Sequence, residues 1–283
     1  MKLLRHGPHG AEKPGLLDAQ GRARDLSMLI EDIDAALLST QFAALAAVKP
    51  ETLPLVAGDV RLGVPVARVG KIVCIGLNYR DHAAEAQQPP PQEPIIFLKA
   101  VSALNGPEDP VVLPPDSHKA DWEVELGVVI GSECRYVSER QALEYVAGVC
   151  VVDDLSEREF QIERGGQWDK GKGCDTFGPV GPYLVTGLDA GQLGRLGLWL
   201  EVNGKRMQEG NTANMIFPVP FLVHYISQFM SLQPGDVIAT GTPAGVGMGR
   251  KPPVWLQEGD TIRAGIDGLG EQRQCVRRFR RQG

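Results

Sequence analysis

The sequence lacks the features that mark membrane-embedded, secreted or nucleic-acid-binding proteins. It contains no apolar run long enough to cross a bilayer. Gly7 and Pro8 interrupt the start of the chain before the apolar segment of a secretory signal could form. The net charge of -6 disfavours nucleic acid as the main partner. We therefore expect a cytosolic protein that binds neither membranes nor nucleic acid.

The sequence is also poor in the motifs of several common enzyme classes. Its five cysteines are odd in number and never form a CxxC pair, so we expect free thiols rather than disulfides or a cysteine-rich metal site. No GxxxxGK[ST] loop and no GxGxxG between a strand and a helix is present, which removes support for nucleotide binding. The absence of GxSxG and HExxH likewise gives no support to a serine hydrolase or a zinc protease.

What the sequence does contain is the composition of an ordinary globular protein. Apolar residues make up 43% and charged residues 23% of 283 residues, which allows a large core. From Lys71 onward, short apolar runs alternate with turn signals, which predicts a mainly β domain over residues 67–283. Prolines at 50, 54 and 65 mark the end of the preceding part, so residues 1–66 are predicted to form a small N-terminal domain and linker.

A few helices and one tight hairpin are predicted beside the strands. Apolar spacing favours helices over residues 26–38 and 41–47 and around His224. Residues 138–148 carry Ser138 and Gln141 at the spacing of a capping box, which also predicts a helix. The Asn203-Gly204 pair between two apolar segments predicts a hairpin turn.

Three carboxylates are candidates for a metal site. Glu123 and Glu125 lie two residues apart in a predicted strand, so their side chains point to the same face. Asp154 follows a second apolar run, VAGVCVV, that is typical of a buried strand. The alternative is that the two glutamates form the solvent face of an amphipathic strand. The other polar clusters described below lead us to favour a divalent metal site. Buried carboxylates require a compensating cation, and such an ion would provide it.

Two further clusters place acid–base and cationic groups at helical spacing. His82 and Glu85 are three residues apart, an arrangement in which the carboxylate could orient a general base. The alternative is an ordinary surface contact. Asp154, Arg158 and Gln161 would share one face of a helix, where a guanidinium suits an anionic substrate. An ordinary helix start with a solvated Arg158 is the alternative reading.

Two loops complete the set of candidate residues. Lys170 and Lys172 lie in a glycine-broken loop without periodicity, from which one lysine could reach the metal site. The charge agrees, because three carboxylates and a divalent ion leave one negative charge for an ammonium to cancel. In ATGTPAGVGMG, the backbone N–H groups and the Thr242 hydroxyl could hold a substrate carboxylate.

Taken together, these segments resemble the fumarylacetoacetate hydrolase family from about Lys71 to the C-terminus. The similar motifs, in the same order, are GLNYRDHAAE, FLKA, DWEVELGVVIG, VVDDLSEREFQ, KGKGCDTFGPVGP, NGKRMQEGNT and PGDVIATGTPAGVG. The resemblance implies an α+β, mainly β fold, with a mixed β-roll catalytic domain and a small N-terminal domain. It also implies a homodimer with one Mg²⁺ or Mn²⁺ per subunit.

The resemblance also implies roles for the candidate residues. Glu123, Glu125 and Asp154 would bind the metal, and Lys172 would be the cation beside the substrate. His82 and Glu85 would activate water from a mobile lid. The remaining residues with an implied role, all substrate contacts, are Arg158, Gln161 and Thr242.

The reaction implied by the resemblance is metal-dependent hydrolysis of a C–C bond in a 2,4-dioxo acid, giving pyruvate and a carboxylic acid. The N-terminal part, the segment GRKPPVWLQEGD and the lysine loop KGKGCDTFGP resemble bacterial relatives that act on 2,4-diketo-3-deoxy-L-fuconate or -rhamnonate, where lactate would be the second product. The same scaffold supports other activities, namely oxaloacetate decarboxylation, ureidoglycolate cleavage and isomerisation or hydration of unsaturated diacids. A metal-stabilised binding domain without catalysis is an alternative of another class.

Overall fold

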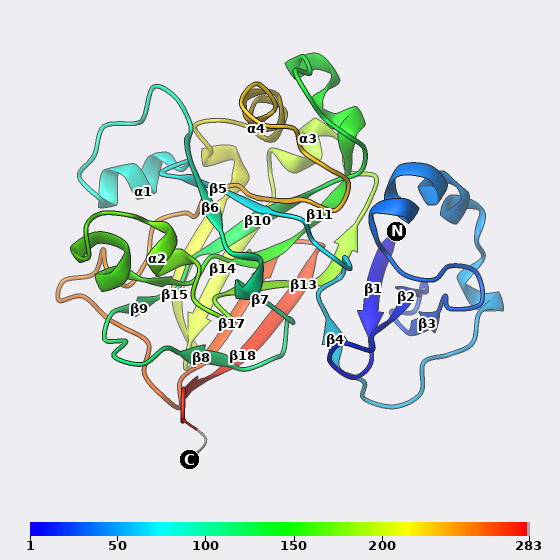
Figure 1. The fold of residues 1–283 in the computed structure, drawn as a ribbon, viewed down its shortest axis with the longest axis horizontal. Coiled ribbons are helices and arrows are strands. Elements are labelled where there is room, and N and C mark those ends of the chain that lie inside the picture. Colours follow the sequence, from blue (N-terminus) through cyan, green and yellow to red (C-terminus); the bar gives the residue numbers. More distant parts are fainter. Residues whose placement is uncertain (282–283) are drawn as a thin grey trace.

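The computed structural model describes residues 1–281, which form three β-sheets surrounded by short helices (Figure 1). The largest sheet has eleven strands, in the order β3-β2-β1-β13-β11-β10-β16-β5-β6, with β4 beside β1 and β7 beside β13. Its strands are β1 (Lys2–His6), β2 (Lys13–Leu17), β3 (Ala23–Asp25), β4 (Leu62–Gly63), β5 (Ile72–Gly76), β6 (Ile95–Lys99), β7 (Leu104–Asn105), β10 (Val124–Ile130), β11 (Val146–Asp153), β13 (Gly178–Val185) and β16 (Val237–Ala239).

A five-stranded sheet packs beside the large one, and a two-stranded sheet lies near the carboxylates. The five-stranded order is β15-β14-β17-β18-β8, with the strands β8 (Val111–Leu113), β14 (Gly197–Val202), β15 (Lys205–Asn211), β17 (Thr261–Ile266) and β18 (Gly270–Arg278). The small sheet pairs β9 (Ala120–Asp121) with β12 (Ser156–Glu157). The predicted hairpin turn joins β14 to β15, where Asn203 and Gly204 have φ values of 53° and 74°.

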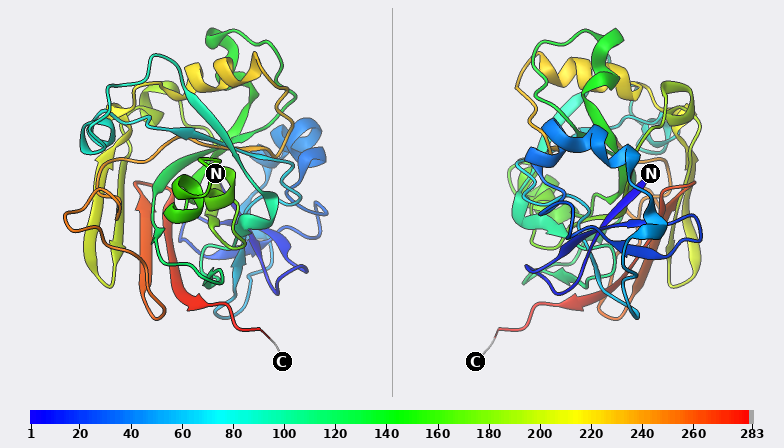
Figure 2. Two further views of the ribbon diagram at one scale, coloured as in Figure 1. Left: turned by 60° about the vertical axis from the view of Figure 1, so that its left-hand side comes forward. Right: turned by 90° about the vertical axis from the view of Figure 1, so that its right-hand side faces the viewer.

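Helices are short and lie around the sheets. The α-helices are α1 (Arg80–Glu85), α2 (Asp169–Lys172), α3 (Ala190–Leu193) and α4 (Val219–Ser227). The other helical turns are η1 (Leu37–Gln41), η2 (Phe42–Ala47), η3 (Pro50–Thr52), η4 (Val101–Ala103), η5 (Glu139–Tyr145), η6 (Glu159–Glu163) and η7 (Thr212–Asn214). The helix predicted around His224 is α4, which packs beside η5 at the end of the molecule opposite the C-terminus (Figure 2).

Two helix predictions were wrong in extent. Residues 27–34 form turns rather than helix, because Asp25 accepts a hydrogen bond from the Ser27 N–H and Asp34 accepts from those of Ala36 and Leu37. Such side-chain hydrogen bonds offer the backbone an alternative to the helix and delay its start. Within residues 138–148 the helix is the 3₁₀ helix η5, which ends at Tyr145 because β11 begins at Val146, where the chain pairs with Ile130.

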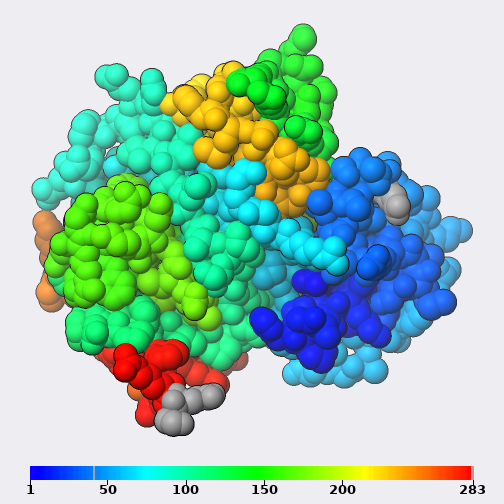
Figure 3. Space-filling view, in the orientation of Figure 1, coloured from blue at the N-terminus to red at the C-terminus, as the bar shows by residue number. Residues whose placement is uncertain are grey.

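The first 66 residues extend the large sheet. β1 pairs antiparallel with β13 through Leu3 and Leu184, and both side chains belong to an apolar cluster that also contains Leu16, Cys74 and Cys150. In the space-filling view this part forms one side of the molecule and abuts the rest (Figure 3). The division of the chain at residue 66 into two domains stays a prediction.

β10 and β11 form the buried centre of the large sheet and confirm the α+β, mainly β fold class. Every residue of β10 is buried, so the strand is covered on both faces. Val124, Leu126 and Val128 face one apolar cluster, whereas Val129 faces the other. Because side chains alternate, Glu123 and Glu125 lie on the same side as Val129, at one end of that face.

The helices and cysteines of the structure bear on membrane insertion and disulfide formation. No helix within residues 1–281 has the length and apolar composition that crossing a membrane requires. All five cysteines are free, and Cys74, Cys134 and Cys150 are buried. The cytosolic location and the homodimer stay predictions.

Candidate metal centre and active site

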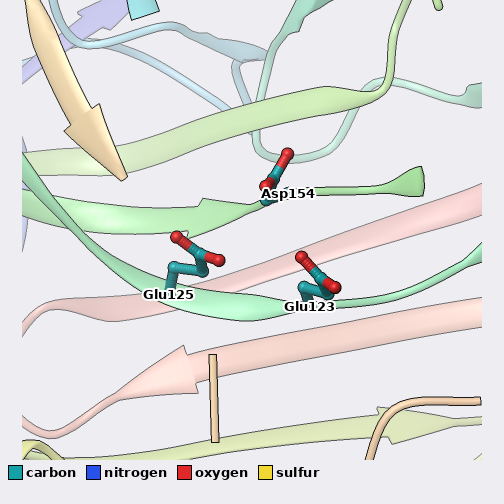
Figure 4. A group of neighbouring side chains, drawn as sticks. All are labelled: Glu123, Glu125 and Asp154. Atoms are coloured by element: carbon teal, nitrogen blue, oxygen red, sulfur yellow. The ribbon is translucent and has the colours of Figure 1, made fainter. Parts of the chain in front are cut away.

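Glu123, Glu125 and Asp154 come together at the ends of two neighbouring strands (Figure 4). Glu123 precedes β10 and Asp154 follows β11, and the antiparallel pairing of Val124 with Asp153 places them side by side. The Asp154 N–H also donates to the Glu123 carbonyl over 2.9 Å. One carboxylate oxygen from each of the three residues lies within 4.8 Å of the others, and all three residues are buried. The structure therefore brings the predicted metal ligands together.

Lys172 is the lysine that reaches these carboxylates. Its Nζ lies 2.5 Å from Glu123 Oε2 and 2.6 Å from Asp154 Oδ2, and the side chain is 2% exposed. It is carried by α2, a single turn that packs against η6 and β6. Lys170 is exposed and instead donates to the carbonyl of Arg164. The loop thus supplies one buried cation to the site and one surface charge.

Arg158 and Gln161 form the next part of the site. Arg158 Nη2 lies 2.6 Å from Glu123 Oε1, and its Nη1 donates to Gln161 Oε1 over 3.0 Å. Both side chains are buried. They do not share a regular helix with Asp154, because β12 intervenes before η6 begins. Arg158 nevertheless lies beside a candidate metal ligand, as predicted, because its guanidinium contacts Glu123.

Two buried charged residues of the site, Lys99 and Asp121, were not predicted from the sequence. Lys99 ends β6, and its Nζ lies 2.7 Å from Asp154 Oδ1 and 3.0 Å from the carbonyl oxygen of Leu155. Asp121 accepts from Arg158 Nε over 2.9 Å and from the backbone N–H of Gly247 over 2.6 Å. The only signals in the sequence were a lysine at the end of the apolar run IIFLK and an aspartate just before the two glutamates.

The buried cluster contains more negative than positive charge. Its four carboxylates and three cations are Asp121, Glu123, Glu125 and Asp154, and Lys99, Arg158 and Lys172. Glu125 makes no ion pair within residues 1–281, and its Oε2 accepts only the Gly241 N–H, over 2.8 Å. A cluster of hard oxygen ligands with excess negative charge, shielded from water, has the chemistry that Mg²⁺ or Mn²⁺ requires. The residues present therefore fit a divalent ion.

The pKa values in the cluster follow from burial and from these neighbours. Burial, together with the negative charges of Asp154 and Glu123, raises the pKa of Glu125 well above its usual value. Burial acts to raise the pKa of Glu123 as well, but the positive charges of Lys172 and Arg158 outweigh it and lower that pKa to about 2. Glu123 and Glu125, two residues apart, thus have pKa values shifted in opposite directions. Glu123 is paired with cations, whereas Glu125 has no cationic partner within residues 1–281.

Thr242 lies beside the same carboxylates, with its hydroxyl already engaged. Thr242 Oγ1 donates to the Val124 carbonyl over 2.9 Å and accepts from Gln208 Nε2 over 2.7 Å. The preceding Gly241 has φ of 97°, and a Cβ there would lie 2.7 Å from Asn78 Cβ, so the turn requires glycine. The role of Thr242 as a substrate contact stays a prediction. Because the hydroxyl proton is already donated to Val124, Oγ1 could only accept a further hydrogen bond from a substrate.

His82 and Glu85 form a pair on α1 that is held from both sides. His82 Nδ1 lies 3.0 Å from Glu85 Oε2, and Glu85 Oε1 accepts from the Gly245 N–H over 2.9 Å. His82 is 9% exposed, which is too little for an ordinary surface contact. Glu85 also lies against Gly249, where a Cβ would be 2.5 Å from Glu85 Cδ. Because Nδ1 faces the carboxylate, Nε2 is the ring nitrogen left for a substrate or water.

A cavity of about 250 Å³ connects these groups. Its volume is just below the usual range of pockets for drug-sized ligands, so it suits a small metabolite. The lining residues are Ile75, Gly76, Leu77, His82, Ala86, Gln88, Phe97, Glu123, Glu125, Arg158, Gln161, Ile162, Trp168, Lys172, Thr242 and Met248. All three predicted substrate contacts and two of the three predicted metal ligands are among them.

Comparisons with known proteins identify similar sequences and structures. Residues 71–277 match the family model described as fumarylacetoacetate (FAA) hydrolase, C-terminal. A Burkholderia ambifaria protein that bears the name "Putative hydrolase" is 61% identical over 279 residues, which cover 98% of this chain and 99% of that protein. The solved structure of fumarylacetoacetate hydrolase from Exiguobacterium antarcticum is 33% identical, with a TM-score of 0.85, and covers 99% of this chain and 100% of that one. The 2-hydroxyhepta-2,4-diene-1,7-dioate isomerase from Mycobacterium marinum is 35% identical, with a TM-score of 0.75 and the same coverage.

Proposed function

Because the chain belongs to the fumarylacetoacetate hydrolase family, we propose that it is a divalent-metal-dependent enzyme that hydrolyses a C–C bond in a 2,4-dioxo acid. The products would be pyruvate and a carboxylic acid. The observation that carries the proposal is that Glu123, Glu125 and His82 line one cavity, which joins a candidate metal centre to a candidate general base. Arg158 and Lys172 add positive charge to the same cavity, which suits an anionic substrate.

The candidate metal ligands are Glu123, Glu125 and Asp154. When bound there, Mg²⁺ or Mn²⁺ would act as a Lewis acid that stabilises negative charge developing on the substrate oxygens. Lys172 would stabilise the same charge from the protein side, in a buried position where such interactions are strong. Arg158 and Gln161 are already fixed to each other and would orient the substrate in the cavity.

His82 is the residue best placed to activate water. Its Nε2 would remove a proton from a water molecule that attacks the C4 carbonyl of the substrate, while Glu85 holds Nδ1 and favours the protonated ring. The bond between C3 and C4 then breaks, and C4 leaves as the carboxylic acid. C3 takes up a proton to become the methyl group of pyruvate. One water is consumed: its hydroxyl group becomes part of the carboxylic acid, and its proton balances the one taken up at C3 of pyruvate.

Within this class, the proposal includes 2,4-diketo-3-deoxy-L-fuconate and -rhamnonate as substrates, whose cleavage would give lactate beside pyruvate. The support is the likeness of motifs around Lys172 and Lys251 to bacterial enzymes of that kind. The cavity volume is compatible with a short sugar-acid chain.

A second candidate function is isomerisation of an unsaturated 2-oxo or 2-hydroxy acid. The observation that favours it is the similarity to a solved structure named as an isomerase, at 35% identity over 99% of this chain. The same residue, His82, would then move a proton between two carbon atoms and no water would enter the reaction. The two functions therefore differ in whether pyruvate leaves the enzyme.

The test is a substrate screen with two readouts. The purified protein is incubated with a set of 2,4-dioxo acids and unsaturated 2-hydroxy diacids, with Mg²⁺, with Mn²⁺ or with EDTA. Pyruvate is detected by coupled reduction to lactate, and isomerisation by the change in ultraviolet absorbance. Metal-dependent pyruvate release supports the hydrolase. An absorbance change without pyruvate supports the isomerase, and neither signal would favour a binding domain without catalysis.

A further inference from the structure

The cavity has two ends of opposite chemistry. Its polar end is formed by Glu123, Glu125, Arg158 and Lys172. Beside Lys172, Phe97 and Trp168 meet edge to face, with ring centroids 5.3 Å apart. A substrate whose 2-oxo acid group occupies the polar end therefore extends along aromatic surface.

The outer rim of the cavity is apolar as well. Ile162 is 49% exposed and Met248 is 38% exposed, although both line the cavity, so they lie where it opens to solvent. Leu77 and Ala86 contribute further apolar surface. Apolar side chains at the opening indicate that the distal part of a ligand meets hydrocarbon there, rather than polar groups.

The residues that line the cavity supply no cation free for a second anionic group. Among the residues that line it, the positive charges are those of Arg158 and Lys172, and both are paired with carboxylates at the polar end. Three basic residues in the adjoining segments donate to backbone carbonyls outside the lining: Lys170 to that of Arg164, Arg80 to that of Met215, and Arg250 to that of Met207. Gln88 offers neutral N–H donors at most, and these do not compensate a full charge.

We propose that the enzyme selects 2-oxo acids with a single carboxylate and an uncharged, largely apolar tail, and discriminates against dicarboxylates. This inference rests on the proposed function, because it assumes that the 2-oxo acid group lies at the polar end. A distal carboxylate would lose water against Phe97, Trp168 and Ile162 without gaining a cation, whereas an apolar tail gains from the same burial. The hydrophobic walls thus act as the specificity element.

Binding of two matched ligands tests the inference without requiring turnover. 2-Oxohexanoate and 2-oxoadipate have the same number of carbon atoms and differ in a terminal methyl against a terminal carboxylate. Calorimetric titration of each into the Mg²⁺-loaded protein is expected to show 2-oxohexanoate binding at least about tenfold more tightly. Equal affinities, tighter binding of 2-oxoadipate or no binding of either ligand would overturn the proposal.

A variant at the rim gives the reciprocal test. Ile162→Lys places a cation beside the distal part of the ligand on a side chain that is half exposed, so the fold should tolerate it. We expect this variant to bind 2-oxoadipate about tenfold more tightly than wild type does. Ile162→Gln is the matched control, because it adds polarity and length without charge. This variant should keep the wild-type preference for 2-oxohexanoate over 2-oxoadipate. An equal gain in both variants, or no gain in Ile162→Lys, would contradict the inference.

Turnover of a second pair separates this inference from the proposed function. Butyrylpyruvate and succinylpyruvate differ in the same way at the distal end, and both would release pyruvate. Equal release from the two would leave the hydrolase assignment standing and overturn the selection against dicarboxylates. Failure of both to react, with the binding preference for 2-oxohexanoate retained, would overturn the hydrolase assignment and leave the selectivity supported.

Discussion

Lys99 and Asp154 form a fully buried ion pair, with Lys99 Nζ 2.7 Å from Asp154 Oδ1. The same ammonium donates to the carbonyl oxygens of Leu155 and Lys172. Lys99 thus joins the end of β6 to Asp154, which follows β11, and to α2, which carries Lys172. Because Asp154 is a candidate metal ligand, we infer that Lys99 positions this carboxylate rather than contacting the substrate.

Replacing Lys99 by methionine should destabilise the protein. The substitution keeps most of the side-chain volume but leaves Asp154 with Lys172 as its remaining cation, and breaking a buried ion pair typically costs about 3 kcal/mol or more. Urea unfolding of the metal-free protein measures the loss. Lys170→Met is the control, because Lys170 is exposed, and it should change stability by less than about 0.5 kcal/mol. Equal stability of the two variants would show that the buried pair has no structural role.

Glu125→Gln should weaken metal binding and at the same time stabilise the metal-free protein. Glu125 has no cationic partner within the described residues and lies near the carboxylates of Glu123 and Asp154. Removing its charge relieves repulsion by about 1 kcal/mol, whereas loss of a ligand should reduce Mg²⁺ affinity at least about 100-fold. Calorimetry and thermal unfolding measure the two effects. Lower stability with unchanged metal affinity would assign Glu125 a purely structural role. Glu139→Gln, at an exposed position, is the control.

Variants of the His82–Glu85 pair should separate catalysis from metal binding. His82→Ala is expected to lower kcat by about two to four orders of magnitude, the usual contribution of a positioned acid–base group. Glu85→Gln should cost less, because the amide still contacts the ring but no longer favours the protonated form. Metal affinity should stay near that of wild type in both. Steady-state kinetics and calorimetry provide the comparison, with the exposed His9→Ala as control. A near-normal kcat in His82→Ala would place the base elsewhere.

Gly249→Ala should disturb the His82–Glu85 pair through a steric contact with Glu85. A Cβ at this position would lie 2.5 Å from Glu85 Cδ and 2.7 Å from its Oε1, so the flexible carboxylate would move away from His82. We expect stability to change little and kcat to fall to the level of Glu85→Gln. Hydrogen exchange of α1 should increase at the same time, because its anchor on Gly245 is lost. Gly194→Ala is the control, since a Cβ there finds ordinary contacts beyond 3.3 Å. An unchanged kcat would show that the contact with this loop is not required.

The sequence predicted those parts of the site that depend on local spacing. The alternation along a strand places Glu123 and Glu125 on one side, and the spacing of three residues brings His82 to Glu85. Both arrangements follow from the geometry of a single element. Asp154 could be predicted because the apolar run before it is typical of a buried strand that ends at the acid.

The contributions of Lys99 and Asp121 could not be predicted in the same way. Lys99 meets Asp154 only because β6, β5, β16, β10 and β11 lie side by side in one sheet, and this order is not encoded in any local pattern. Asp121 meets Gly247 across a separation of 126 residues in the chain. The helix predicted over 26–38 failed for a local reason, since Asp25 and Asp34 bind backbone N–H groups that a helix would use.

We propose above that the buried carboxylates bind a divalent ion on which cleavage depends. The most direct test is pyruvate release from an acylpyruvate by metal-free protein to which Mg²⁺ or Mn²⁺ is added stepwise. We expect no release in EDTA and activity that rises to a plateau at one ion per chain, with Glu125→Gln requiring far higher metal concentrations. Pyruvate release that is undiminished in EDTA would contradict it.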